Sequence, residues 1–181
     1  MRRSIDERPA DAADRKTQGH WEADYMLFAR YGHNILVAHE RALRLTLLAC
    51  PPDRKAQRTA QALAGLIGPW PKAMRSTLTM DNGTEFAEHH RLAEQIGIHT
   101  FFCDPHAPWQ KGGIENAIGR LRRYLPRHTD LETLSPNELV AIASPYNNTP
   151  RKCLDFLTPA EAYLAYPLHF ECESTGCPAR R

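Results

Sequence analysis

Residues 78–86 read LTMDNGTEF, an apolar run that ends at Asp81 and passes into a polar turn. Asp-Asn-Gly is a strong hairpin signal, and a second strand would then have to follow. Residues 84–96 instead have helical spacing, with Thr84 as the expected N-cap and Gly97 at the expected end. We therefore predict a strand that delivers Asp81 to the carboxyl edge of a sheet, where open α/β sheets bind their ligands.

The rest of the chain supplies four more strand signals and several helix signals. Short apolar, β-compatible runs lie at residues 21–28, 34–39, 43–49, 76–80 and 98–103. Helical spacing covers residues 54–67, 84–96 and 114–125, and capping boxes at Ser135 and Thr158 open two more helices. Antiparallel strands first and crossovers later predict an α/β fold with a mixed five-stranded sheet flanked by helices.

The chain has 181 residues, which is the length of one ordinary domain. We expect a linker or flexible arm over residues 1–18, a core domain over 19–166 and a tail over 167–181. The sequence has no run of 18 apolar residues, so no membrane-spanning helix is predicted. The first residues lack the apolar core of a signal peptide. These features predict a cytoplasmic protein.

Charge and cysteine content exclude little by themselves. The five cysteines form no CxxC pair, and their odd number argues against a disulfide framework. Net charge is +2, but residues 106–152 carry seven basic and four acidic side chains. That excess of +3 surrounds a second acidic residue, Glu115, where a phosphate backbone would approach. A solvated helix face is the alternative explanation.

Asp24 and Glu115 are, like Asp81, acidic residues that could bind a metal ion. Asp24 lies inside an apolar strand, so it must be paired, exposed at an edge or bound to a cation. Glu22 shares its face by strand alternation, so either could be the ligand. Glu115 begins an amphipathic helix after a glycine pair, where an acid is also favourable for the helix dipole. Clustered carboxylates of this kind suit hard divalent cations such as Mg²⁺.

Several motifs occur together and in order. They are IDERP at 5–9, GHWEAD at 19–24, ER at 40–41, MDNGTEFA at 80–87, DP at 104–105, PWQKG at 108–112, EN at 115–116, Gly119 and NNTPRK at 147–152. With these motifs the chain resembles the DDE transposases of the insertion-sequence-thirty family, within the retroviral-integrase superfamily, from about Ile5 to about Tyr166. Ala23, Ile114 and the pair His106-Ala107 depart from the family pattern but leave all three carboxylates in place.

The resemblance implies an RNase H-like fold with Asp24, Asp81 and Glu115 as catalytic and metal-binding residues for two Mg²⁺ or Mn²⁺ ions. It also implies double-stranded DNA, both element ends and target, as the substrate, a homo-oligomer and a bacterial, nucleoid-associated location. We hypothesise two-metal phosphoryl transfer in DNA cleavage and strand transfer. Side chains expected to orient the carboxylates are Asn82, Glu85 and Asn116. Expected DNA contacts are Trp109, Lys111, Arg122, Arg123, Arg151 and Lys152. A packing role is the alternative for Trp109.

The resemblance also leaves rival hypotheses. Family members carry an N-terminal helix-turn-helix region, and the chain starts at the linker, so we expect a truncated transposase. The alternative is a catalytically silent fragment that binds DNA or full-length transposase as a regulator or relic. A generic RNase H-like nuclease, which would cleave RNA–DNA hybrids, is a third hypothesis.

Overall fold

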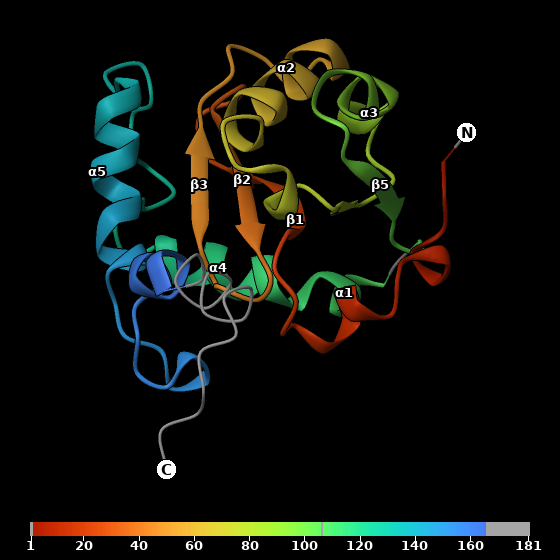
Figure 1. Cartoon of the computed structure of the whole chain (residues 1–181). Helices are drawn as coiled ribbons and strands as arrows, with labels where there is room; N and C mark the ends of the chain where they lie inside the picture. Colours follow the sequence, from red (N-terminus) through yellow and green to blue (C-terminus); the bar gives the residue numbers. More distant parts are fainter. Residues whose placement is uncertain (1, 106, 166–181) are drawn as a thin grey trace.

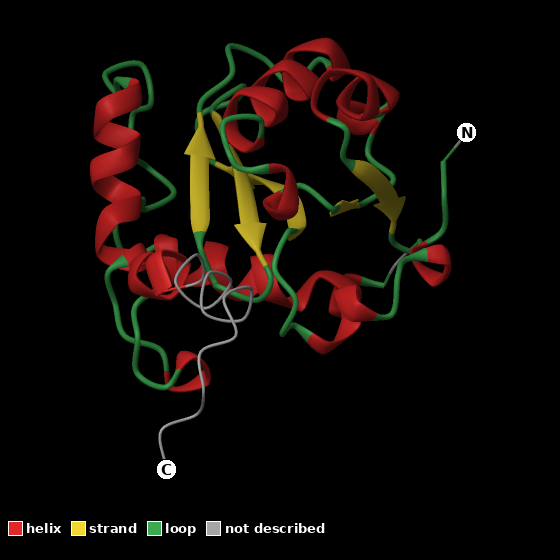
Figure 2. Cartoon of the chain, in the orientation of Figure 1, coloured by secondary structure: helices red, strands yellow, loops and turns green. Residues whose placement is uncertain are grey.

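The structure, a computed structural model, is built on one five-stranded sheet and describes residues 2–105 and 107–165. Its strands are β1 (His20–Leu27), β2 (Asn34–Glu40), β3 (Thr46–Ala49), β4 (Thr77–Met80) and β5 (His99–Phe102). The strand order is β3-β2-β1-β4-β5. Strand β2 is antiparallel to both β1 and β3, whereas β4 runs parallel to both β1 and β5. The mixed five-stranded sheet is therefore confirmed (Figure 2).

Helices cover both faces of this sheet. They are α1 (Asp11–Asp14), α2 (Ala56–Ile67), α3 (His90–Ile96), α4 (Gly112–Leu121) and α5 (Pro136–Asn147). Short 3₁₀ turns are η1 (Ile5–Glu7), η2 (Lys72–Met74), η3 (Thr84–Phe86), η4 (Pro108–Lys111) and η5 (Lys152–Leu154). Helices α2 and α3 pack on one face, and α4 and α5 pack on the other (Figure 1). The prediction that helices flank the sheet is therefore confirmed.

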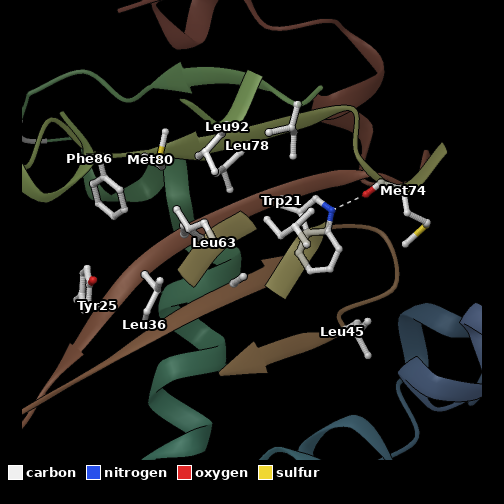
Figure 3. Close-up of a cluster of buried hydrophobic side chains, with 14 of the residues drawn as sticks. Trp21, Tyr25, Leu36, Leu45, Leu63, Met74, Leu78, Met80, Phe86 and Leu92 are labelled. Atoms are coloured by element: carbon white, nitrogen blue, oxygen red, sulfur yellow. Dashed lines mark hydrogen bonds between the residues drawn. The ribbon is translucent and has the colours of Figure 1, made fainter. Parts of the chain in front are cut away.

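Strand alternation divides the core into two layers. On β2, Leu36 and Ala38 pack toward α2, while Ile35 and Val37 pack toward α4. Trp21 is fully buried in the first layer, and its indole nitrogen donates to the backbone oxygen of Met74 at 2.7 Å (Figure 3). The opposite face of β1 is left to present its acidic side chains to α4.

The local signals differ in how well they predicted the helix boundaries. The capping box of Ser135 with Glu138 is present at the start of α5, and Gly97 ends α3 with a φ of +69°. Thr84 is not an N-cap, because a 3₁₀ turn starts there and α3 begins only at His90. The expected cap was wrong because the Phe86 and Ala87 amides, which a Thr84 cap would bind, donate instead to the backbone carbonyls of Gly83 and Thr84 at 3.2 and 3.1 Å.

Residues 2–18, which we expected to form a linker or flexible arm, contact the sheet. The Phe102 amide donates to the carbonyl of Arg3 at 2.9 Å, and the Arg8 guanidinium donates to the Thr79 hydroxyl at 3.1 Å. Ala12 is buried. The expected tail at 167–181, with Cys172 and Cys177, lies outside the described residues. No helix in the described part of the chain is long and apolar enough to cross a membrane.

The indole of Trp21 provides a test of this core. Trp21→Phe should lower the free energy of unfolding by about 1–3 kcal/mol, because it leaves a cavity and an unpaired Met74 carbonyl. Trp109→Phe is the matched control, since Trp109 is 72% exposed. The control should change stability by less than about 0.5 kcal/mol in urea unfolding. Equal effects of the two substitutions would contradict the burial of Trp21 in the core.

Candidate active site

Asp24 and Asp81 lie side by side just beyond the last paired residues of the parallel strands β1 and β4. Strand β1 pairs with β4 in a register that joins Glu22 to Thr79, so two more residues bring Asp24 opposite Asp81. Each carboxylate has one oxygen held by the backbone. Asp24 Oδ1 accepts the Tyr25 amide at 2.7 Å, and Asp81 Oδ1 accepts the Gly83 amide at 2.9 Å. The Oδ2 atoms therefore remain available for a shared cation.

Lys111 provides such a cation. Its Nζ lies 2.9 Å from Asp24 Oδ2 and 3.1 Å from Asp81 Oδ2. Burial alone would lower the pKa of Lys111, but attraction by the two carboxylates and their hydrogen bonds outweigh burial and hold that pKa above its usual value. The ammonium is thus charged and lies between the two aspartates, a contact that the sequence did not predict.

The loop before Lys111 is braced from within. Gln110 Nε2 donates to Asp104 Oδ2 at 2.8 Å, and the Asp104 amide donates back to Gln110 Oε1 at 2.8 Å. This reciprocal pair closes the loop between β5 and η4. These hydrogen bonds fix the backbone beside Lys111, where the loop meets α4, and so position its ammonium at the two aspartates.

Glu22, the alternative to Asp24, has a different role in the structure. It is fully buried, its Oε2 accepts the Ile114 amide at 2.7 Å, and Arg41 Nε lies 3.3 Å from Oε1. Gly113 makes this approach possible, because a Cβ there would lie 2.9 Å from Glu22 Oε2. Glu22 therefore anchors the first turn of α4 to β1 and leaves Asp24 as the acid beside Asp81.

Glu115 lies in the first turn of α4, four residues after Lys111, with its side chain exposed. Its side chain makes no hydrogen bond or ion pair with any described residue. Within residues 2–105 and 107–165 there is also no group of three or more His, Cys, Asp or Glu side chains that could hold a metal ion. The structure thus brings Asp24 and Asp81 together, and it leaves Glu115 apart from them on the neighbouring helix.

The Asp24–Asp81 pair fits a divalent cation. Both donors are hard carboxylate oxygens of the kind that Mg²⁺ and Mn²⁺ prefer. The position between them already accommodates a positive charge, that of Lys111. Both carboxylates are partly exposed, at 25% and 44% of the side chain, so an ion and its waters have access from solvent.

The side chains expected to orient the carboxylates fall into two groups. Asn82 Nδ2 donates to the Cys103 carbonyl at 2.7 Å, and Glu85 pairs with Arg54. Both contacts brace the turn that carries Asp81. Asn116 instead accepts from Arg120 Nε at 3.0 Å, within α4.

The expected DNA contacts also divide by their surroundings. Trp109, Arg123 and Lys152 are exposed, which removes the packing alternative for Trp109. Arg122 donates to the Leu27 carbonyl, and the buried Arg151 donates to the Tyr146 carbonyl at 3.0 Å. The last two side chains therefore also have partners within the fold.

Sequence reasoning missed the role of Glu22 and the contacts of Lys111. The signal for Glu22 was a glycine pair at a helix start, which permits close approach by an acid on a neighbouring strand. No local pattern indicates that Lys111 turns toward residues 30 and 87 positions away.

Lys111→Met tests the role of the ammonium in EDTA. Removing the cation leaves two adjacent carboxylates to repel each other, so the free energy of unfolding should fall by about 1–2 kcal/mol after screening by water. Mg²⁺ should restore more stability to this variant than to the unsubstituted protein, because a cation is missing. Lys152→Met, at an exposed position, is the control. Equal losses in both variants, measured by thermal or urea unfolding, would refute the bridging role.

His39 predicts a pH dependence. It is buried on β2, its Nδ1 lies 2.9 Å from Thr46 Oγ1, and burial followed by the charges of Arg44 and Arg15 lowers its pKa to about 3. As the pH falls, the unfolded state therefore binds a proton at His39 near pH 6.5, whereas the folded state binds it only near pH 3. Stability due to His39 is complete above pH 6.5 and falls toward pH 3 by about 1.4 kcal/mol per pH unit.

His39→Gln removes this titration and keeps an amide for Thr46. Urea unfolding between pH 7 and pH 4.5 should give a shallower loss of stability in the variant than in the unsubstituted protein. Parallel pH profiles would show that His39 is not the responsible group.

The chain is similar in sequence to transposases of several bacterial insertion sequence elements. No family model matches the chain. The transposase of insertion sequence element IS1086 from Cupriavidus metallidurans is 44% identical over 161 residues, 87% of this chain and 47% of that protein. Transposase InsI of IS30A from Escherichia coli K12 is 36% identical over 157 residues, 87% of this chain and 41% of that protein. The IS4351 transposase from Bacteroides fragilis is 31% identical over 88% of this chain and 48% of that protein.

The chain thus spans less than half the length of each of these relatives. Among solved structures, the catalytic core domain of BIV integrase superposes with a TM-score of 0.62 at 23% identity, over 85% of this chain and 99% of that one. The predicted family and fold are confirmed: the chain is a homologue of the insertion-sequence-thirty transposases over 87% of its length, with the RNase H-like fold of an integrase catalytic core.

Proposed function

We propose that this chain is the catalytic core of a transposase, which cleaves DNA strands and transfers them in a metal-dependent reaction. The observation that carries the proposal is the Asp24–Asp81 pair, whose Oδ2 atoms both lie within hydrogen-bond distance of one cation, the Lys111 ammonium. The transposases that align with the chain support the reaction class. The substrate would be double-stranded DNA carrying the element ends, together with a target duplex.

In this proposal Asp24, Asp81 and Glu115 are the catalytic residues and hold two Mg²⁺ or Mn²⁺ ions. Bound divalent cations would activate water or a DNA 3′-hydroxyl and stabilise the leaving oxygen of an in-line displacement. Glu115 contributes from the first turn of α4, whose position against β1 is set by Glu22. Asn82 and Glu85 keep the Asp81 carboxylate in place through their contacts with Cys103 and Arg54.

The surroundings of the carboxylates suit a DNA strand. Trp109 is exposed in η4, two residues before Lys111, where an indole can stack on an unpaired base. Arg123 and Lys152 are exposed cations that can contact phosphates and would make binding dependent on salt. Because transposition joins two ends, we propose that the chain acts as a homo-oligomer.

The proposal is tested by cleavage of labelled duplexes that carry candidate element ends, in Mg²⁺, Mn²⁺ or EDTA. Asp24→Asn, Asp81→Asn and Glu115→Gln should each reduce nicking and joining by at least about a hundredfold, since a metal ligand supplies several kcal/mol. Asp155→Asn is the matched control at an exposed residue whose φ of +51° suits asparagine. Full cleavage by Asp81→Asn would refute the mechanism.

Two other outcomes decide between the rival hypotheses. Folded protein that binds DNA but does not cleave it in any metal would favour a catalytically silent fragment. Cleavage of RNA–DNA hybrids without strand transfer would favour a generic RNase H-like nuclease.

A further inference from the structure

A second charged site lies on the other side of the N-terminal turn of α4. It is a cavity of about 240 Å³, lined in part by four arginines that are far apart in the sequence. They are Arg15, Arg44, Arg120 and Arg151. Gly113 and Asn116 of α4 also line it. The volume is roughly that of eight water molecules, which is more than a single small ion needs.

The positive charge in this cavity is not neutralised by the part of the chain that the structure describes. No acidic side chain from that part lines the cavity, and none lies within 4.0 Å of the four guanidinium groups. The nearby His39 reflects the same field, since burial and then the charges of Arg44, Arg15 and Arg151 lower its pKa. Four like charges gathered without a counter-charge favour an anionic ligand.

Two of the arginines also have unused donors. Arg151 is only 9% exposed and gives one nitrogen to the Tyr146 carbonyl, yet its buried Nε has no hydrogen-bond partner among the described residues. The same is true of Arg44 Nε. Buried donors without acceptors are costly, and charged ones are more so. These two donors are free to bind the acceptor atoms of a ligand in the cavity.

The chemistry and the location of the cavity identify the ligand class. Arginine forks match the paired oxygens of a phosphate, and the cavity has room for a phosphodiester together with an adjoining sugar. Helix α4 borders both sites, since Lys111 and Glu115 lie at its start while Asn116 and Arg120 line the cavity. We infer that the cavity is a phosphate-binding subsite, which holds the DNA backbone at a nucleotide beyond the one that lies at Asp24 and Asp81.

This inference rests on the proposed function for its source of phosphate, so the test separates the two. Binding of a fluorescent duplex is measured in EDTA, where cleavage plays no part, with NaCl varied. The variant Arg44→Gln/Arg120→Gln leaves the buried Arg151 in place, and the control is Arg58→Gln, an exposed arginine of α2 on the opposite face of the sheet. Thermal melts check that all variants fold.

The double variant should bind DNA at least about tenfold more weakly, and its log K should depend less steeply on log[NaCl], by a slope of about 1. The Arg58→Gln control should change affinity less than about twofold. Methylphosphonate substitution, which removes the charge of one phosphate at a time, then locates the contact. One position should weaken the unsubstituted protein but have no further effect on the double variant, because the partner is already lost.

Each contrary result has its own meaning. Equal DNA affinity of the unsubstituted protein and the double variant would overturn the subsite without touching the proposed function. Stabilisation of the fold by inorganic phosphate, lost in the double variant but with DNA affinity unchanged, would make the cavity a site for free anions and also overturn the assignment. Intact subsite behaviour without cleavage in Mg²⁺ would refute the proposed catalysis while supporting the subsite.

Discussion

The carboxylate of Glu22 joins the central strand to helix α4, and the geometry on both sides of that helix follows from this contact. Its Oε2 accepts the Ile114 amide at 2.7 Å, and Arg41 supplies positive charge 3.3 Å from Oε1. A fully buried carboxylate would be costly without such partners. Because the contact holds the first turn of α4 against β1, it also sets where Lys111, just before that turn, meets the sheet.

Glu22 and Asp24 show that a shared face does not give a shared role. Alternation along β1 correctly predicted that both side chains project to the same side, and it could not choose between them. The two side chains differ in how deeply they are buried. Glu22 is fully buried and its Oε2 accepts the Ile114 amide of α4, whereas Asp24 lies nearer the strand end with Oδ2 facing a cation. Strand position therefore makes one acid structural and leaves the other available for chemistry.

Local patterns predicted much of the fold because they act over a few residues. The five strands, the α5 capping box and the stop at Gly97 all follow from such patterns. Thr84 failed as a cap because a 3₁₀ turn forms there, in which the Phe86 and Ala87 amides donate to the backbone carbonyls of Gly83 and Thr84. Contacts between distant residues could not be predicted from the sequence: Lys111 contacts Asp24 across 87 positions, and the cavity brings together arginines from Arg15 to Arg151.

The two charged sites around α4 carry net charges of opposite sign. Two aspartates with one lysine leave a net negative charge, which repels a phosphate backbone, while four arginines on the other side attract one. If the proposed function holds, divalent cations at the aspartates remove that repulsion, and the arginines hold the strand whether or not a cation is bound. DNA affinity and cation affinity then reinforce each other through the field across α4, without any change in the fold.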